Sequence, residues 1–144
     1  MTGLSPRLAA LIESLPLEPG QRVLEIGGGP GAAARAVCER LGLEGHVLMI
    51  DRSSTAIAQA ERGSRALIAD GRLSLRCVAA EKFALLPDEA PFDLAFAFRV
   101  GALDGRHPEA EAAALARVAQ ALTPEGRLFI DGGDPLREIP LPET

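Results

Sequence analysis

A short apolar run that ends in an acid and opens at once into a glycine-rich turn constrains this chain more than any other feature. Residues 23–26 read Val-Leu-Glu-Ile, and residues 27–31 follow as Gly-Gly-Gly-Pro-Gly. Apolar residues then recur at helical spacing between Ala33 and Leu41. Glycines let the backbone bend sharply and let a ligand approach without meeting a Cβ atom, and the first helical turn offers unpaired N–H groups. The pattern predicts a strand, a turn and a helix that bind a nucleotide-type cofactor.

Two classes of cofactor site fit this turn. Gly27, Gly29 and Ala32 match the relaxed dinucleotide fingerprint, which accepts alanine at its third position. Gly27, Gly29 and Gly31, with Glu25 just before them, instead resemble motif I of the class I S-adenosylmethionine-dependent methyltransferases.

Pro30 and Glu25 favour the methyltransferase alternative. Proline has no N–H to offer a pyrophosphate, and a Gly-x-Gly-Pro-Gly turn is frequent in that family. A carboxylate at the strand tip suits the cationic α-amino group of a methionine moiety and would repel a diphosphate. The resemblance implies that Glu25 meets this amino group while the glycines of the turn cradle the methionine part.

A second acid follows the next predicted strand. Residues 46–50 form a second buried strand in this interpretation, and the strand ends at Asp51. An acid about 20 residues beyond the glycine turn binds ribose hydroxyls in either class of site. Residues 51–60, an acid-x-Ser junction followed by an apolar helix face, resemble the methyltransferase family at this point. In the alternative interpretation, Asp51 only caps a helix that begins near Ser53, and the two roles can coexist.

The junction after the third predicted strand, Leu73 to Cys77, departs from the family. Relatives often read Gly-Asp-Ala-Glu there, and their Asp reaches the adenine amino group. This chain has Ala79 in place of that Asp. Backbone groups at Ala79 and Ala80, or the Glu81 carboxylate, could replace it.

The resemblance runs from about Pro19 to Asp131. Residues 92–98 begin with Phe-Asp like the family's fourth strand, and residues 115–130 resemble the helix, turn and fifth strand that follow. The chain has no Trp and no Tyr, so aliphatic walls or the Arg52 stem would flank the adenine. The resemblance implies a cofactor-binding set of Glu25, Gly27, Gly28, Gly29, Gly31, Asp51, Arg52, Ala80, Glu81 and Phe98.

The order of the elements predicts an α/β, Rossmann-like fold with a doubly wound parallel sheet. A helix over residues 6–14 comes first, and the fifth strand lies near residues 127–131. The resemblance implies the strand order 3-2-1-4-5, with the cofactor across the carboxyl ends of the first three strands. We expect one S-adenosylmethionine-binding domain over residues 1–144.

The Pro-rich tail, residues 132–144, is too short for the hairpin and helix that usually complete such a sheet. We therefore expect the sixth and seventh strands to be missing. Exposed strand edges invite pairing, so either the tail or a second copy in a homodimer is expected to cover the fifth strand.

Composition limits the partners. The net charge of −5 argues against nonspecific nucleic-acid binding, which requires a basic face. The sequence has no leader pattern at Met1, no run long enough to span a membrane, and two cysteines without metal-ligand spacing. These features predict a cytoplasmic protein without membrane contact or a metal site.

The loop after the fourth strand should face the transferred methyl group; it includes Arg99, Val100, Gly101, Asp104 and His107. It does not read Asn/Asp-Pro-Pro-Tyr, the signature for methylating exocyclic amines of bases and glutamine amides. His107 is a candidate general base, because histidine is the side chain that most often takes this role near neutral pH, but Pro108 after it favours a helix-capping position. Arg99 is a candidate partner for an anionic acceptor. The catalytic residues therefore stay unassigned.

The favoured hypothesis is S-adenosylmethionine-dependent methyl transfer to an unidentified small molecule, with S-adenosylhomocysteine as product. The alternative is a non-catalytic S-adenosylmethionine-binding module or partner-dependent subunit, because no base is evident and the C-terminus is short. A nicotinamide-dependent oxidoreductase is disfavoured by Pro30, by Glu25 and by the lack of a tyrosine for a Tyr-Lys proton relay.

Overall fold

Six strands in the part of the chain that the structure describes form one sheet at the centre of the fold, in the spatial order β3-β2-β1-β4-β5-β6. The structure, a computed structural model, describes residues 4–100, 103 and 107–143. Strands β1 to β5 run parallel, and β6 is antiparallel to β5. The predicted Rossmann-like α/β class and the order 3-2-1-4-5 are therefore confirmed. The strands are β1 (Arg22–Ile26), β2 (His46–Asp51), β3 (Leu73–Cys77), β4 (Phe92–Ala97), β5 (Leu122–Asp131) and β6 (Leu136–Ile139).

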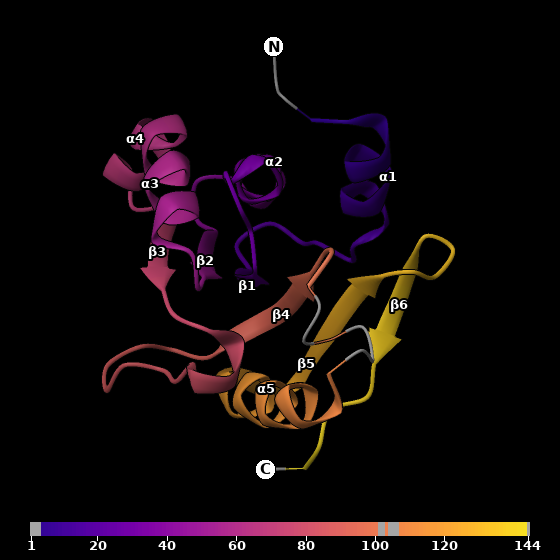
Figure 1. Cartoon of the computed structure of the whole chain (residues 1–144). Helices are drawn as coiled ribbons and strands as arrows, with labels where there is room; N and C mark the ends of the chain where they lie inside the picture. The colour runs from indigo at the N-terminus through magenta and orange to yellow at the C-terminus, as the bar shows by residue number, and fades with distance from the viewer. Residues whose placement is uncertain (1–3, 101–102, 104–106, 144) are drawn as a thin grey trace.

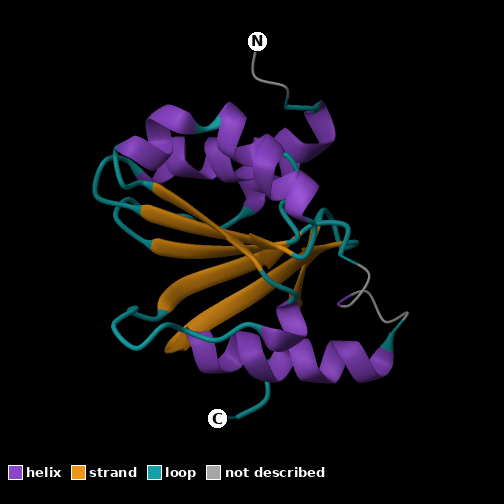
Figure 2. Cartoon of the chain, turned by 60° about the vertical axis from the view of Figure 1, so that its left-hand side comes forward, coloured by secondary structure: helices purple, strands orange, loops and turns teal. Residues whose placement is uncertain are grey.

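Helices cover both faces of this sheet (Figure 1 and Figure 2). Among the described residues, α1 to α4 lie over one face, and α5 lies over the other with the short 3-10 helix η1 against it. None of the described helices is long and apolar enough to cross a membrane. The helices are α1 (Pro6–Ser14), α2 (Ala32–Leu41), α3 (Ser54–Gly63), α4 (Arg65–Ala69), η1 (Ala80–Lys82) and α5 (Pro108–Ala121).

The core lies in two layers because successive side chains of a strand point to opposite faces. Along β2, Val47 and Met49 pack under the α2 side, whereas Leu48 and Ile50 pack under the α5 side. All four are at most 1% exposed. A parallel sheet that is covered on both faces needs apolar residues at nearly every position, and this explains the continuous apolar runs in the sequence.

The predicted helix over residues 6–14 is confirmed as α1. The Ser5 side chain accepts a hydrogen bond from the Leu8 N–H at 3.1 Å, and Pro6 takes the first helical position. Both features favour a helix start. Arg7 then reaches the end of β5, where it donates a hydrogen bond to the Asp131 carboxylate at 2.9 Å. This ion pair fixes the N-terminal helix near the carboxyl edge of the sheet.

The expectation that a sixth strand is missing was wrong. Part of the tail forms β6, which pairs with residues 128–131 of β5. An antiparallel strand needs only a short turn, here residues 132–135, whereas another parallel strand would need a long crossover. The prediction counted residues for the hairpin and its connecting helix and so overlooked this shorter solution. The tail covers the β5 edge, which confirms one of the two expectations. The homodimer stays a prediction.

Candidate functional site

The glycine turn between β1 and α2 is packed on one side and open on the other. Gly27, Gly29 and Gly31 have φ values of 70°, 58° and 93°, a region that side chains other than glycine rarely adopt. The Gly27 N–H donates to the Ile50 carbonyl at 2.8 Å, which ties the turn to β2. A Cβ atom on Gly27 would lie 2.6 Å from Val100 Cγ2, whereas one on Gly29 would meet no described atom within 4 Å. The open side at Gly29 leaves room for a ligand.

Asp51, at the carboxyl end of β2, organises this turn. One carboxylate oxygen accepts a hydrogen bond from the Gly29 N–H at 3.0 Å, and the other accepts from the Ser53 N–H at 2.8 Å. The side chain that caps α3 is Ser53, which accepts from the Ala56 N–H at 3.1 Å. Each oxygen of a carboxylate can accept more than one hydrogen bond. Asp51 can therefore hold the turn and still receive hydroxyl donors from a ligand.

Glu25 is a buried carboxyl group without a hydrogen-bond partner at one oxygen. Its exposure is 3%, and no described group donates to Oε1. Burial, reinforced by the negative charge of Asp51 and opposed by Arg35, raises the pKa of Glu25 to about 8. An unsatisfied buried polar group is unfavourable. A cationic donor at this position would satisfy the carboxylate and stabilise its charged form.

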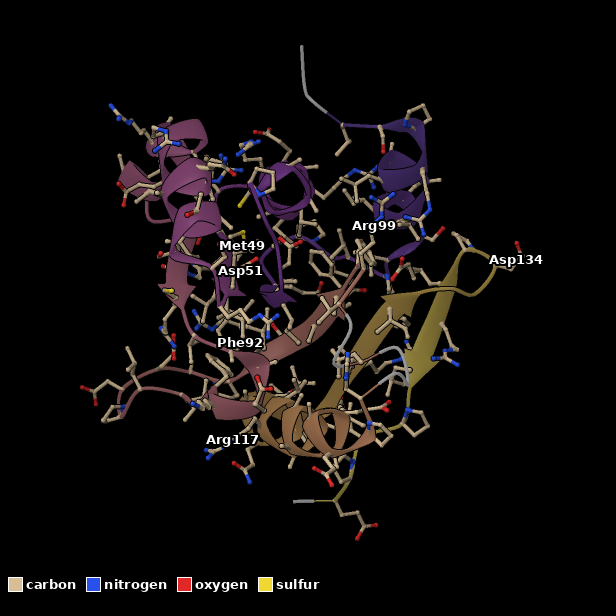
Figure 3. The ribbon with its side chains drawn as sticks, viewed as in Figure 1. Met49, Asp51, Phe92, Arg99, Arg117 and Asp134 are labelled. Atoms are coloured by element: carbon tan, nitrogen blue, oxygen red, sulfur yellow. The ribbon has the colours of Figure 1, made fainter. Side chains whose placement is uncertain are left out.

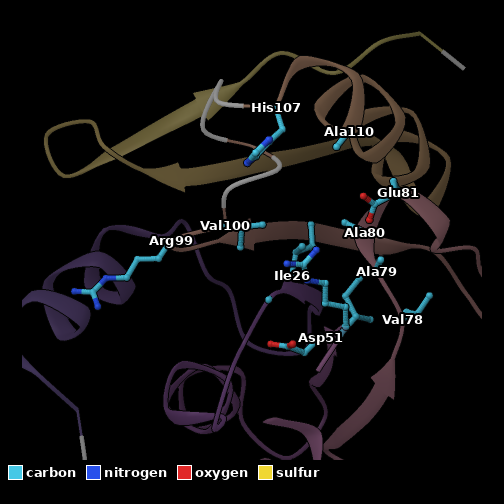
Figure 4. Close-up of a pocket in the computed structure, with 13 residues that line it drawn as sticks. Ile26, Asp51, Val78, Ala79, Ala80, Glu81, Arg99, Val100, His107 and Ala110 are labelled. Atoms are coloured by element: carbon cyan, nitrogen blue, oxygen red, sulfur yellow. The ribbon is translucent and has the colours of Figure 1, made fainter. Parts of the chain in front are cut away.

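A cavity of about 510 Å³ opens at the carboxyl ends of the central strands, where the strand order reverses between β1 and β4. This is where open α/β sheets bind ligands. Figure 4 shows Asp51 and Val78 on one side of it and His107 with Ala110 on the other. The lining residues are Ile26, Gly27, Ile50, Asp51, Arg52, Val78, Ala79, Ala80, Glu81, Arg99, Val100, His107 and Ala110.

A second cavity, of about 200 Å³, lies between the glycine turn, α1 and the end of β4. It shares Gly27 and Arg99 with the larger cavity. Its lining residues are Ser5, Arg7, Leu8, Glu25, Gly27, Gly28, Pro30, Ala32, Ala33, Phe98 and Arg99.

The two cavities divide the cofactor-binding set predicted from the sequence. Four of its members line only the larger cavity, three line only the smaller one, and Gly27 lines both. Gly29 and Gly31 line neither. The first group is Asp51, Arg52, Ala80 and Glu81, and the second is Glu25, Gly28 and Phe98.

Sequence reasoning missed the contribution of α1. Ser5, Arg7 and Leu8 line the smaller cavity, but they precede the glycine turn by about 20 residues and carry no motif. Only the docking of α1 beside α2 brings them there.

The residues after β4 that the sequence suggests for binding or activating the acceptor have different surroundings. His107 lines the larger cavity and directly precedes α5, so its predicted capping position is confirmed, although its side chain makes no capping bond. Arg99 has a φ of 64°, and its N–H donates to Asp131 at 3.0 Å. Gly101 and Asp104 lie outside the described residues.

Asp131, at the end of β5, receives hydrogen bonds from both Arg99 and Arg7. Burial by itself would raise the pKa of Asp131. The bonds from the Arg99 N–H and the Arg7 side chain outweigh burial and hold this pKa below its usual range. An ionised Asp131 therefore fixes both α1 and the backbone at Arg99.

Alanine at Gly28 is expected to destabilise the fold more than alanine at Gly29. A Cβ atom on Gly28 would lie 2.3 Å from Met49 Cγ and 2.8 Å from Glu25 Oε1. Both neighbours are buried, so overpacking should cost about 1–3 kcal/mol. At Gly29 only the left-handed backbone is unfavourable, by about 1–2 kcal/mol. Thermal unfolding of the two variants measures the difference, and equal melting temperatures would contradict this packing.

The fold and its site define a class: doubly wound α/β proteins that bind a nucleotide-type cofactor at the carboxyl edge of the sheet. Within that class, the chain belongs to the family described as "Methyltransferase domain", whose sequence model matches residues 23–126. The resemblance drawn from the glycine turn and the later junctions is thereby confirmed.

Individual relatives agree with this assignment. A protein-L-isoaspartate O-methyltransferase of Methylorubrum extorquens is 38% identical over 128 residues, which are 89% of this chain and 49% of that protein. A methyltransferase structure from Thiobacillus denitrificans in complex with S-adenosyl-L-homocysteine has a TM-score of 0.67 at 26% identity, covering 88% of this chain and 48% of that one. Phosphoethanolamine N-methyltransferase 2 of Haemonchus contortus has a TM-score of 0.68 at 27% identity, over 86% and 27% of the two chains. The chain spans about half the length of the curated relatives it matches.

Proposed function

We propose that this chain binds S-adenosylmethionine and transfers its methyl group to an acceptor. The observation that carries the proposal is the buried Glu25 carboxyl, which lacks a hydrogen-bond partner at Oε1 and lies beside a glycine turn. The α-amino group of a methionine moiety is a cationic donor of the kind this carboxyl lacks. The complex of the Thiobacillus relative with S-adenosyl-L-homocysteine supports the same ligand.

The residues of both cavities suit the parts of this cofactor. Asp51 can accept the ribose hydroxyls, and Arg52, Ala80 and Glu81 line the wall available to adenine. Adenine would pack on aliphatic groups such as Val78, since the chain has neither Trp nor Tyr. The glycine turn and Glu25 would hold the methionine end. When bound, S-adenosylmethionine supplies an electrophilic methyl group, and the protein contributes mainly by positioning the acceptor.

For the acceptor we propose a carboxylate oxygen of an isoaspartyl residue in a peptide. The support is the name of the Methylorubrum relative, a protein-L-isoaspartate O-methyltransferase. A carboxylate is already ionised at neutral pH, so no base has to remove a proton from it. This acceptor therefore requires no catalytic role of His107, which then only occupies the position before α5.

The test is methyl transfer from labelled S-adenosylmethionine to an isoaspartyl peptide, with the aspartyl peptide of the same sequence as control. We expect label on the first peptide only, as a base-labile methyl ester, and an unchanged rate for His107→Ala. Equal labelling of both peptides, or of neither, would contradict the isoaspartyl acceptor.

A small-molecule acceptor is the second candidate. It is favoured by the part of the larger cavity near His107 and Ala110, which lies across from Asp51 and could enclose a compact acceptor (Figure 4). The similarity to a phosphoethanolamine N-methyltransferase also supports a small-molecule acceptor. Labelling of small amines and acids, but of neither peptide, would favour this candidate.

A further inference from the structure

A side chain continues the link between β4 and β5 beyond their last pair of strand residues. That last pair is Ala97 with Ile130. One residue further along β5, the Asp131 carboxylate accepts a hydrogen bond from the Arg99 N–H at 3.0 Å. Asp131 is itself held from its other side, because it pairs with Leu136 of β6. The carboxylate is therefore a fixed acceptor to which the end of β4 is attached.

The backbone that Asp131 holds has a conformation that its residue type does not favour. Arg99 is the one non-glycine residue in the described part of the chain with a positive φ, at 64°. Residues in such conformations persist where the surrounding structure enforces them, and they cluster at functional sites. Arg99 lies at the end of β4 next to α1 (Figure 3). Asp131 binds Arg7 of that helix through its second oxygen at 2.9 Å, so one carboxylate holds both segments.

The residue after Arg99 lies where the two cavities meet. Val100 packs so closely on Gly27 that a Cβ atom on this glycine would be 2.6 Å from Val100 Cγ2. Gly27 lines both cavities, and Val100 lines the larger one (Figure 4). From Val100 the chain continues to His107 through the segment expected to face the transferred methyl group. Asp131 lines neither cavity, so it acts on this junction through the backbone that it holds.

We propose that Asp131 is a positioning residue for methyl transfer. By holding the Arg99 N–H, it fixes Val100 against Gly27 and so sets where the acceptor lies relative to the methyl group. This inference rests on the proposed function.

The proposed role concerns the rate of transfer more than the affinity for the cofactor. Transfer requires the acceptor atom to be close to the methyl group and in line with it, and a displacement of about 1 Å can reduce the rate roughly 100-fold. The carboxyl groups that we assign to the cofactor, Glu25 and Asp51, belong to β1 and β2. Loss of the link at the end of β4 should therefore slow transfer while the cofactor still binds.

The test measures the kcat of transfer from labelled S-adenosylmethionine to the isoaspartyl peptide and to small amines and acids, and the Kd of S-adenosylhomocysteine by calorimetry. Asp131→Ala should lower kcat by roughly 10- to 100-fold and change the Kd by less than about threefold. Asp131→Asn should lower kcat less than Asp131→Ala does. Its amide oxygen can still accept from the Arg99 N–H, although its NH2 group cannot pair with Arg7.

Asp93→Ala is the matched control. Asp93 also accepts a backbone N–H, that of Arg22, at 2.8 Å. It does so at the amino ends of β1 and β4, and it lines neither cavity. Its loss should lower the melting temperature and leave kcat and Kd unchanged, and circular dichroism at the assay temperature verifies that every variant is folded.

Three outcomes would overturn the inference. An unchanged kcat in Asp131→Ala would show that the link does not position the junction. A Kd that rises by the same factor as kcat falls would give Asp131 a general structural role. An equal loss of kcat in Asp93→Ala would attribute the slower transfer to reduced stability. A wild type that transfers no methyl group to any of these acceptors would instead contradict the proposed function, and the inference with it.

Discussion

Glu25→Gln is expected to stabilise the free protein at pH 8 and to weaken S-adenosylhomocysteine binding by at least about tenfold. Glutamine has nearly the same shape but carries no charge that burial can penalise. It also cannot form the ion pair with an ammonium group that we assign to Glu25, and such charge-assisted hydrogen bonds contribute about 1.5–3 kcal/mol. One substitution should therefore raise stability and lower affinity.

The pH dependence of stability explains why Glu25→Gln should be more stable than the wild type at pH 8. The pKa of Glu25 is about 8 in the folded protein and 4.5 in its ordinary state. Between these values the unfolded chain has lost the proton while the folded protein retains it. The contribution of Glu25 to stability is therefore fully present below pH 4.5, declines as the pH rises, and is lost above about pH 8.

Denaturant titrations of wild type and Glu25→Gln at pH 4.5, 6 and 8 measure this effect. The free energy of unfolding of the variant, relative to wild type, should increase with pH by a few kcal/mol, since one pKa unit corresponds to about 1.4 kcal/mol. A difference that stays constant across these pH values would show that Glu25 is not buried as a neutral acid.

Asp51→Ala is expected to weaken S-adenosylhomocysteine binding by roughly 100-fold and to reduce stability by about 1–3 kcal/mol. The substitution leaves the Gly29 and Ser53 N–H groups without the acceptor they have now. It also removes the carboxylate that we assign to the ribose. Calorimetric titration measures the first effect, and denaturant unfolding measures the second.

The matched control for this variant is Asp88→Ala. Asp88 is exposed and lines neither cavity, so both affinity and stability should stay near wild type. If Asp51→Ala binds S-adenosylhomocysteine as the wild type does, the assignment of the larger cavity to adenosine is wrong.

The sequence predicts well those parts of the site that are local in the chain. The strand, turn and helix around Gly27 follow from apolar spacing and glycine conformation, and Asp51 follows from its place at the end of the next strand. Parallel strands bring their carboxyl ends to one edge of a sheet. For this reason, most of the residues read separately along the chain line the two adjoining cavities at that edge.

The remaining features depend on contacts between distant segments. Arg7 and Asp131 are 124 residues apart, and no local pattern pairs them. Arg99 has a positive φ that arginine does not favour, and its N–H donates to Asp131, which lies 32 residues further along the chain. The antiparallel strand β6 has little sequence signal of its own, because its four residues, Leu-Arg-Glu-Ile, do not alternate between apolar and polar.

Isothermal titration calorimetry of the wild type with S-adenosylhomocysteine, S-adenosylmethionine and NADH tests the central claim most directly. The account predicts saturable binding of the first two ligands and none of NADH, because Pro30 in the glycine turn has no N–H to offer a pyrophosphate. Binding of NADH alone would contradict the assignment of the site to S-adenosylmethionine.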